Sequence, residues 1–524
     1  MSEIEESNSI PVPAPAAVPV PSKKSKKGKK GSRNPSEITP EYIAQQRALR
    51  EAQKQAKREA LIASGVDPDQ IDLPLDLRFI SRPLLDVPET IYSSSSSATS
   101  SSIAGVKVSI MTYNILAQAL IRRKLFPTSG NALKWFKRSK VLLSEFKHYN
   151  SDILLLQEVD YIQYNSFWKP EFKKLGYLSD YQRWGDKNHG VAVFFRECMF
   201  DQTDRMTIDY DKEVIEGVPQ RVQTKNVGLL VALKFKKAIT DKYQESKKKG
   251  IIIGTTHLFW HPFGTVTRTR QTYIVLRQTM EFYKRVRLLQ GKEDEWYTFF
   301  GGDFNSQPFD SPYLSITSKP IQYTDRARTV LECSTAYELE KVRLGSADAD
   351  DEDAPEEEEG EDQEEEPEAD SQTETTAAQQ EIKFTTPVPE SFEATQEEHD
   401  IIDRLQSVHN SQPIIAHSLY SLAYKHVHPE NAGVDNTKDE PEISNWAHTW
   451  RGLLDYIFYV TPWDPSSSDD TKLSVKDVMD SYGFKITKLL KMPLGKDMPD
   501  HGIPHEGEYP SDHLCMIAEV ELLL

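Results

Sequence analysis

The chain has 524 residues, with 63 basic and 81 acidic side chains and a net charge of −18. Sixteen of the acidic residues lie in residues 348–370, which hold no Lys or Arg, so the rest of the chain is nearly neutral and a nucleic-acid partner is not excluded. Three widely spaced cysteines (Cys198, Cys333 and Cys515) exclude a disulfide scaffold and a zinc cluster, and they indicate a reducing compartment.

Residues 1–105 are predicted to form a disordered basic tail, a charged helix and a Ser-rich linker. The basic run at residues 23–30 fits a nuclear-import or RNA-tethering signal, or else a solvated tail. Residues 40–63 have a helical composition with Pro at the first turn, and residues 93–102 are almost all Ser. The early acidic residues do not fit a secretory signal or a mitochondrial presequence. The chain also lacks the run of about 18 apolar residues that a membrane helix needs. We expect no membrane partner and a cytoplasmic and/or nuclear location.

The remaining residues, 106–524, alternate between strand and helix patterns. The predicted strands are 106–113, 152–157, 190–195, 227–235, 250–256, 297–301 and 454–460, with helices at 135–149 and 268–289. This alternation predicts one large α/β domain. The acidic segment, with its flanks about 346–394, has too few apolar residues to fold and should loop out from the domain. It is either a solubilising loop or a surface for a protein partner.

Polar residues that can bind a metal or take part in catalysis follow several predicted strands. In α/β proteins, functional sites are built at strand ends. Glu158 ends a buried apolar run, and a carboxylate there is costly unless it meets a cation such as Mg²⁺; the simpler interpretation is a solvated Glu. His257 directly follows another strand and can contact a phosphate oxygen, although a structural His is more common. Asn114 closes the first strand.

Two further segments carry carboxylates beside amide or imidazole groups. In residues 299–306 (FFGGDFNS) two glycines let the backbone approach a ligand, Asp303 can align or deprotonate a water, and Asn305 can donate to a phosphate oxygen. A plain Gly-Gly-Asp turn is the competing interpretation. Near the C-terminus, Asp512 can supply a second carboxylate to a metal, and His513 needs an orienting partner, for which Asp455 is a candidate.

Taken in order, these segments resemble the endonuclease/exonuclease/phosphatase superfamily over residues 106–524. The resemblance implies two packed mixed β-sheets flanked by helices, a four-layer α/β/β/α sandwich. It also implies roles for the matching residues: Glu158 and Asp512 as metal ligands, and six catalytic residues, namely Asn114, His257, Asp303, Asn305, Asp455 and His513. The implied cofactor is Mg²⁺, with Mn²⁺ as an alternative.

Two stretches resemble the nocturnin/carbon-catabolite-repressor branch of that superfamily. These are residues 256–262 (THLFWHP) and 449–458 (TWRGLLDYIF). The resemblance places Trp260, Pro262, Trp450 and Arg451 in substrate binding, with Trp450 and Pro262 around a terminal base; for both tryptophans, core packing is the alternative. The basic arm and residues 40–47 look most like the fungal Ngl-type RNA exonucleases. Thr255 departs from the branch, which often has Asn two residues before the His.

The function implied is a Mg²⁺-dependent 3′–5′ exoribonuclease that acts on a single-stranded RNA 3′ end and releases nucleoside 5′-monophosphates. Its implied role is 3′-end trimming, in rRNA precursor processing or poly(A) removal. A nocturnin-like phosphatase acting on NADP(H) is one alternative, and a non-catalytic RNA-binding protein is another. Inositol phosphatases of this fold carry a Pro-Ala-Trp-Cys-Asp-Arg segment, which residues 451–455 replace here by RGLLD.

Overall fold

The computed structural model describes residues 40–63, 70, 73–92, 105–243, 246–337, 392–467 and 474–524. The chain divides into two compact units, residues 1–68 and 69–524. In the first unit the described part is helix α1 (Pro40–Ala63), as its composition predicts, and the side chains of residues 47–56 are exposed. The predicted tail 1–39, the Ser-rich linker and nearly all of the acidic insert lie outside the described residues.

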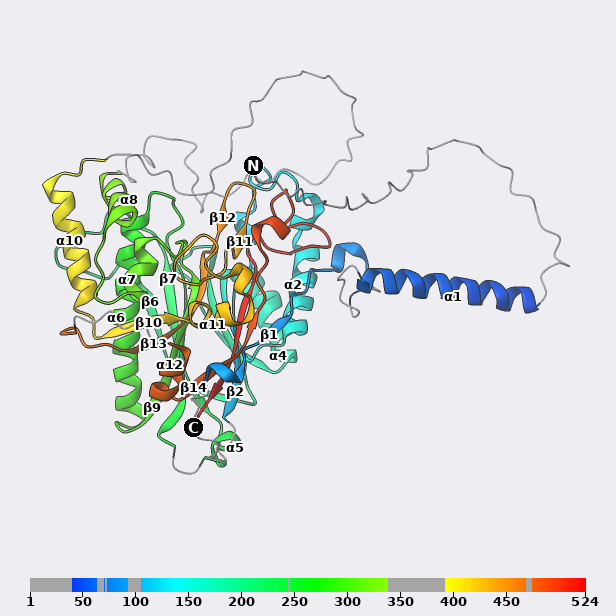
Figure 1. Ribbon diagram of the computed structural model, residues 1–524, viewed down its shortest axis with the longest axis horizontal. Helices are drawn as coiled ribbons and strands as arrows, with labels where there is room; N and C mark the ends of the chain where they lie inside the picture. Colours follow the sequence, from blue (N-terminus) through cyan, green and yellow to red (C-terminus); the bar gives the residue numbers. More distant parts are fainter. Residues whose placement is uncertain are drawn as a thin grey trace, which may run out of the picture. The chain divides into compact units, whose positions relative to one another are not determined.

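The second unit contains two large mixed sheets (Figure 1). The first has the strand order β1-β14-β15-β2-β3-β5-β4. Its strands are β1 (Leu84–Asp86), β2 (Val106–Asn114), β3 (Ile153–Asp160), β4 (Tyr177–Gln182), β5 (His189–Arg196), β14 (Phe484–Leu490) and β15 (Met516–Leu522). Strands β2 and β3 run parallel, whereas the other neighbours are antiparallel.

The second sheet has the order β10-β13-β9-β8-β7-β6. Its strands are β6 (Phe200–Asp209), β7 (Val227–Phe235), β8 (Lys248–His257), β9 (Glu295–Asp303), β10 (Ile414–Ser418) and β13 (Asp455–Pro462). Its parallel pair is β8 with β9. A small hairpin, β11 (Asn445–Trp446) with β12 (Arg451–Gly452), completes the β-structure of the described residues.

Helices cover the outer faces of both sheets (Figure 1). The first sheet carries α2 (Trp135–Tyr149) and α4 (Lys169–Lys174), and the second carries α6 (Thr265–Gln290), α7 (Ser311–Thr317), α8 (Asp325–Ala336) and α10 (Gln396–Asn410). The shorter helices are α3 (Tyr161–Gln163), α5 (Lys237–Thr240), α11 (Leu419–Val427) and α12 (Val475–Tyr482). In the described part of the chain, no helix combines the length and apolarity needed to cross a bilayer.

Side-chain alternation in β2 explains how the layers assemble. Val108 and Ile110 point into the core between the two sheets, whereas Met111 and Tyr113 point into a second core beneath α2. Strand β3 is buried along its whole length because helices and sheet cover it on both sides. The predicted fold, two mixed sheets flanked by helices, is therefore confirmed.

The segment before Val106 also contributes to the folded unit. Strand β1 extends the first sheet by pairing with β14. Next to it, the guanidinium of Arg82 enters the core, where it donates to the Cys515 carbonyl oxygen at 2.7 Å. Glu145 lies in the same buried cluster, accepting from the Tyr113 hydroxyl at 3.0 Å, and burial raises the pKa of Glu145 to about 7 against the opposing charge of Arg82. Sequence reasoning did not include this strand or this arginine in the domain.

We expect Arg82→Met to lower the free energy of unfolding by about 1–3 kcal/mol, because it leaves the buried Cys515 carbonyl oxygen without its donor and removes the positive charge that opposes the raised pKa of Glu145. Denaturant unfolding followed by circular dichroism measures this loss. Lys107→Ala is the control, since that side chain is 64% exposed and its carboxylate partner lies 3.9 Å away. An Arg82 variant as stable as the control would show that the N-terminal segment adds nothing to the core.

Candidate active site

One cavity of about 360 Å³ opens where the ends of strands from both sheets meet. Nine residues predicted from the sequence line it: Glu158, His257, Trp260, Pro262, Asp303, Asn305, Trp450, Asp512 and His513. Strand register explains part of this convergence, because His257, Asp303 and Asp455 stand side by side on β8, β9 and β13. Asn114, at the end of β2, reaches the same place from the other sheet.

Asn114 links the two sheets through its side-chain amide. Its Nδ2 donates to Glu158 Oε1 at 2.8 Å and to Asp303 Oδ2 at 3.0 Å, and its Oδ1 accepts from the Leu116 backbone at 3.0 Å. The amide can make four hydrogen bonds, and three of them are made within the protein. Asn114 therefore fixes the separation of the two carboxylates that face the cavity.

Glu158 points into the cavity because β3 is irregular at this position. The β3–β5 register shifts between Leu156 and Val159, and Glu158 has a φ of 54°, a left-handed conformation that non-glycine residues rarely adopt. The bulge turns the carboxylate toward Ala117, whose backbone N–H donates to Oε2 at 2.9 Å. Leu116 and Asn305 also have positive φ, of 56° and 47°, so strained backbone gathers around this cavity.

Asp303 occupies the centre of the site and is 1% exposed. Its Oδ1 accepts from the Asn305 backbone at 2.8 Å, while Oδ2 lies 3.6 Å from Nε2 of both His257 and His513. These two gaps exceed a direct hydrogen bond. Asp303 thus presents one oxygen to a space bounded by two imidazoles and Asn114, which suits a carboxylate that orients a water.

The two glycines before Asp303 serve strand packing rather than the approach to a ligand that the sequence suggested. A Cβ at Gly302, where φ is 144°, would lie 2.1 Å from the Thr256 carbonyl oxygen of β8. A Cβ at Gly301 would lie 2.9 Å from the Tyr456 carbonyl oxygen of β13. The glycines therefore let three strands approach closely, and this sets the depth of Asp303 in the site.

His513 and Asp455 form the predicted pair. His513 Nδ1 lies 2.8 Å from Asp455 Oδ2, which also accepts from the Ser444 hydroxyl at 2.7 Å. Burial lowers the pKa of His513, but the negative charges of Asp455 and Asp303 outweigh it and hold that pKa well above its ordinary value. The raised pKa favours the charged imidazole, and Nε2 lies 3.6 Å from Asp303 Oδ2 at the cavity.

The metal ligands predicted from the sequence are Glu158 and Asp512. Both line the cavity, and burial together with the negative charge of Glu158 raises the pKa of Asp512 to about 6 although the charge of His513 lowers it. A bound dication would relieve this repulsion. Ligand atoms of Asp303, Asp455 and His513 also lie within 4.8 Å of one another. Of these three residues, Asp455 and His513 are hydrogen-bonded to each other.

The residues predicted to bind substrate occupy two different positions. Trp260, Pro262 and Trp450 line the cavity, whereas Arg451 is not among its lining residues. The Arg451 guanidinium stacks 3.9 Å from the centre of the Trp446 ring and donates to the Asp500 carbonyl oxygen at 2.9 Å. Arg451 thus supports the loop that carries Trp450, and its predicted contact with substrate stays a prediction.

Sequence reasoning missed three supports of this site. Ser444 holds Asp455, and the fully buried Arg138 donates to the carbonyl oxygens of Ile115 and Pro510, which ties the end of β2 to the segment that carries Asp512. The third is a further part of the cavity lining, formed by Leu116, Leu120, Arg122, Leu125 and Phe126. Its sequence signal is the run of three basic residues, 122–124, in the loop after the first strand.

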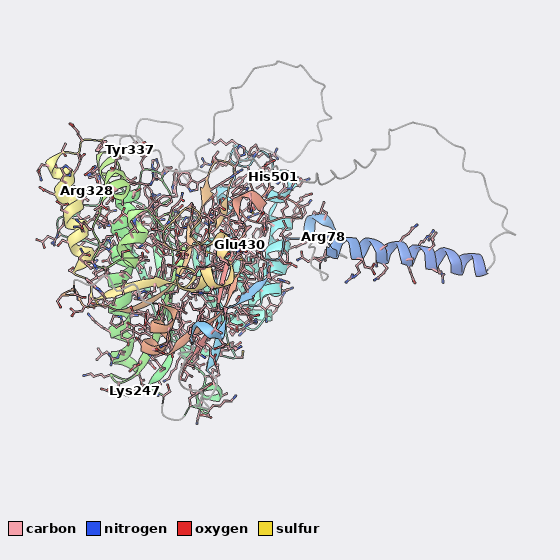
Figure 2. The ribbon with its side chains drawn as sticks, viewed as in Figure 1. Arg78, Lys247, Arg328, Tyr337, Glu430 and His501 are labelled. Atoms are coloured by element: carbon pink, nitrogen blue, oxygen red, sulfur yellow. The ribbon has the colours of Figure 1, made fainter. Side chains whose placement is uncertain are left out.

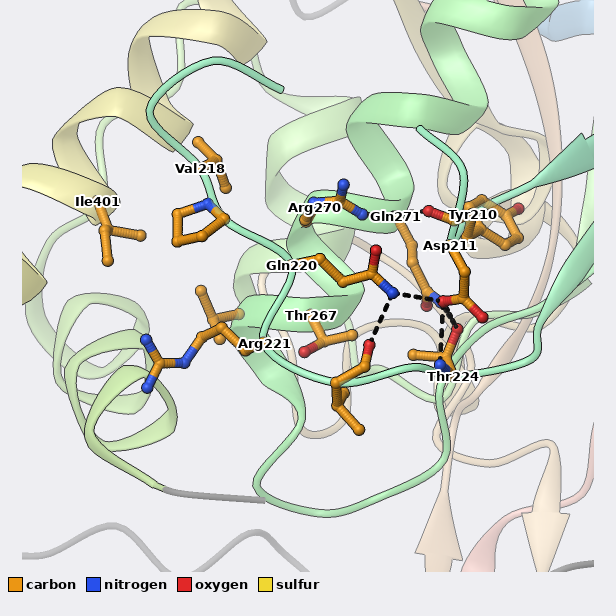
Figure 3. Close-up of a pocket in the computed structure, with 13 residues that line it drawn as sticks. Tyr210, Asp211, Val218, Gln220, Arg221, Thr224, Thr267, Arg270, Gln271 and Ile401 are labelled. Carbon is orange, nitrogen blue, oxygen red and sulfur yellow. Dashed lines mark hydrogen bonds between the residues drawn. The ribbon is translucent and has the colours of Figure 1, made fainter. Parts of the chain in front are cut away.

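A separate crevice lies between α6 and residues 210–224 (Figure 3). Its volume is about 10 Å³, enough for roughly one water. Gln220 Nε2 donates to Asp211 Oδ1 at 3.0 Å and to the Val222 carbonyl oxygen at 3.1 Å, so the segment satisfies its own polar groups. This crevice is a packing feature of the loop and has no catalytic constellation.

A family model described as Endonuclease/Exonuclease/phosphatase family matches residues 111–513. The chain belongs to this family and is an enzyme of it, a hydrolase with acidic and histidine groups that can hold a metal.

Three fungal relatives indicate the branch of the family to which the chain is similar. RNA exonuclease NGL2 of Saccharomyces cerevisiae is 52% identical over 505 residues, 95% of this chain and 92% of that protein. Probable RNA exonuclease NGL3 of the same yeast is 39% identical, over 93% of this chain and 90% of its own. A probable RNA exonuclease of Schizosaccharomyces pombe is 33% identical, over 97% of this chain and 92% of its own. The resemblance to the fungal Ngl-type branch is confirmed.

Proposed function

We propose that this chain is a Mg²⁺-dependent 3′–5′ exoribonuclease that hydrolyses RNA to nucleoside 5′-monophosphates. One observation carries the proposal: a single cavity is lined both by Asp303 and His513, with Asn114 hydrogen-bonded to Asp303 behind them, and by the rings of Trp260, Pro262 and Trp450. Hydrolytic groups beside stacking surfaces suit a flexible, single-stranded end whose last base can leave its neighbour. The names of the three fungal relatives support the same activity.

Glu158 and Asp512 would hold Mg²⁺, or Mn²⁺ in its place. When bound, the ion supplies positive charge against the scissile phosphate. The hard carboxylate oxygens of this pair suit either cation. The Asn114 amide and the Ala117 backbone N–H each occupy one lone pair of the Glu158 carboxylate, which orients it before the ion arrives.

Asp303 is the residue we assign to the attacking water. Its Oδ2 accepts a proton as the water oxygen bonds to phosphorus, and the bond from phosphorus to the 3′-oxygen of the preceding nucleotide breaks. The departing 3′-oxygen takes up a proton from solvent, and the released product carries the phosphate on its 5′-oxygen. Asn114 and Asn305, each hydrogen-bonded to Asp303, keep the carboxylate in position.

His513 stabilises the negative charge that develops on the phosphoryl oxygens. Its Nε2–H faces the cavity, while Asp455 accepts a hydrogen bond from Nδ1–H and fixes the ring. His257, on the other side of Asp303, and the free amide hydrogen of Asn305 offer further donors to the phosphate; the other Asn305 hydrogen is used by the Leu258 carbonyl oxygen at 3.0 Å. The charge of His513 is already present in the resting site, so it needs no reorganisation during the reaction.

Trp450→Ala should weaken binding of the RNA 3′ end by about 5- to 150-fold, because loss of one stacked base corresponds to roughly 1–3 kcal/mol. Trp450→Phe keeps an aromatic face and should retain most of the affinity. Binding to a short RNA with a non-hydrolysable terminal linkage, followed by fluorescence anisotropy, gives the comparison. Equal affinities for wild type and the alanine variant would remove Trp450 from the substrate site.

The activity is tested by incubating the purified chain with 3′- or 5′-labelled RNA and, separately, with NADP, each with Mg²⁺ or EDTA. We expect stepwise shortening of RNA from its 3′ end, release of nucleoside 5′-monophosphates and loss of both in EDTA. Phosphate release from NADP with the RNA left intact would favour the dinucleotide phosphatase instead. Binding of RNA without any cleavage would favour a non-catalytic RNA-binding protein.

The same proposal includes a role in RNA 3′-end trimming, in rRNA precursor processing or in poly(A) removal, in the cytoplasm and/or nucleus. A degradation assay on poly(A), mixed-sequence RNA and a ribosomal precursor fragment distinguishes these roles by rate. The acidic segment 346–394 is proposed to contact a protein partner. Its deletion should leave the rate on a short RNA unchanged, because all the cavity residues lie outside it.

A further inference from the structure

Three metal-ligating side chains gather in the segment that joins β14 to β15, apart from the catalytic cavity. They are His501, His505 and Glu508, none of which lines that cavity (Figure 2 labels His501). All three are half-buried, with side-chain exposures between 25% and 36%. They are therefore held in place by the protein while part of each side chain stays exposed to solvent.

The distances among the donor atoms are close to those of a tetrahedral metal site. His501 Nε2 lies 3.0 Å from Glu508 Oε2, and His505 Nδ1 lies 3.8 Å from Glu508 Oε1. One donor atom from each residue can be chosen so that all three fall within 4.8 Å of one another. Donors bonded to Zn²⁺ at about 2.0–2.2 Å in tetrahedral geometry stand roughly 3.4 Å apart. Small side-chain rotations would therefore suffice to close the site.

An ion pair alone does not account for this cluster. It explains His501, which hydrogen-bonds to Glu508. It accounts less well for His505, whose Nδ1 lies 3.8 Å from Glu508, beyond hydrogen-bond distance, is shielded from solvent and makes no hydrogen bond to any described residue. The ring of His505 nevertheless lies beside that of His501, with centroids 4.3 Å apart, and its Nδ1 is turned toward the same carboxylate. A shielded ring nitrogen without a hydrogen bond, beside a carboxylate, is an arrangement that a bound cation would satisfy.

We propose that His501, His505 and Glu508 form a second metal site, which binds a transition-metal dication of the zinc class. Two imidazole nitrogens and one carboxylate oxygen suit Zn²⁺ and leave one position for water. The catalytic pair, Glu158 and Asp512, supplies oxygen ligands that suit Mg²⁺. The enzyme thus has two sites of different ligand chemistry, which separate two kinds of ion.

The position of the second site indicates that it stabilises Trp446 and Arg451, the residues that support the loop carrying Trp450. The backbone around the site already contacts these two residues. Trp446 Nε1 donates to the His501 carbonyl oxygen at 3.2 Å, and the Arg451 guanidinium donates to the Asp500 carbonyl oxygen. At the other end, the Ile80 N–H donates to the Glu508 carbonyl oxygen at 2.7 Å. An ion held by residues 501, 505 and 508 would cross-link the segment between these contacts.

The test uses the full chain without a histidine tag, stripped of metal and then placed in excess Mg²⁺. Zn²⁺ is titrated in competition with a chromophoric chelator, and Co²⁺ is added separately to record its visible absorption. We expect one Zn²⁺ per chain and the intense visible bands of low-coordinate Co²⁺. His505→Ala and Glu508→Gln should each weaken Zn²⁺ binding at least tenfold. His426→Ala, which removes an exposed histidine elsewhere, should bind as wild type does.

Thermal unfolding gives a readout independent of catalysis. Zn²⁺ should raise the melting temperature of wild type and of His426→Ala but not that of His505→Ala. If the variants do not fold, anomalous scattering from zinc-soaked crystals of the wild-type chain locates the ion directly. The proposal is overturned if wild type takes up no Zn²⁺, if the three variants bind it equally, or if the anomalous peak lies away from residues 501–508.

Discussion

Asp303→Asn is expected to lower kcat for RNA hydrolysis by about 10²- to 10⁴-fold, the contribution typical of a positioned general base. Asparagine keeps the size of the side chain and can still accept from the Asn305 backbone. It cannot take a proton from water, and it replaces an oxygen by an NH₂ group on the side that faces Asn114. We therefore expect the loss mainly in kcat, with little change in KM, because the residue acts on the water and not on the base.

The variant must also be shown to fold. Two donors, the Asn114 amide and the new one, would face each other, at a cost of about 1–3 kcal/mol in stability. Denaturant unfolding separates this cost from the loss of catalysis. Asp201→Asn, a 60% exposed aspartate on β6, is the control for the same chemical change. An Asp303→Asn enzyme that cuts RNA at the wild-type rate would place the reaction centre elsewhere.

Seven of the nine central strands of the two large sheets were predictable from the sequence, and their edge strands were not. The predicted strands correspond to β2, β3, β5, β7, β8, β9 and β13, all interior to their sheets. The four edge strands, β1, β4, β6 and β10, were all missed. Interior strands are covered on both faces and read as continuous apolar runs, whereas β6 exposes most of its polar side chains to solvent. Interior β14 and β15 were missed as well, and partly buried Lys and Glu residues interrupt their apolar pattern.

Site residues were predictable where a polar side chain directly follows a clearly apolar run that predicts a strand. His257 and Asp303 end central strands, Glu158 lies two residues before the end of another, and the structure brings the three to one cavity. The residues that hold the catalytic side chains in place could not be predicted in this way. Ser444 and Arg138 act through hydrogen bonds to partners 11 and 372 residues away, which no local pattern reports. The bulge at Glu158 is likewise a property of β3 paired with β5, and cannot be inferred from β3 alone.

Glu158→Gln is expected to raise the Mg²⁺ concentration for half-maximal activity by at least about tenfold, since loss of even an outer partner of a metal ligand costs 10- to 100-fold in affinity or activity. The substitution removes one of two carboxylate charges from the cavity. It leaves an amide that can still accept from Asn114 but turns a donor toward the Ala117 N–H. Activity as a function of Mg²⁺ concentration measures the shift. Glu171→Gln, on the surface helix α4, should leave it unchanged.

Asp512→Asn, alone and combined with Glu158→Gln, tests whether the two carboxylates bind the same Mg²⁺ ion. If Glu158 and Asp512 hold one ion, the first substitution already removes most of the metal affinity, so the double variant should lose less than the product of the two single losses. Two separate ions would instead give independent, multiplicative losses. The raised pKa of Asp512, which owes part of its shift to the charge of Glu158, is the physical reason to expect coupling. Unchanged Mg²⁺ dependence in both single variants would exclude this pair as the metal site.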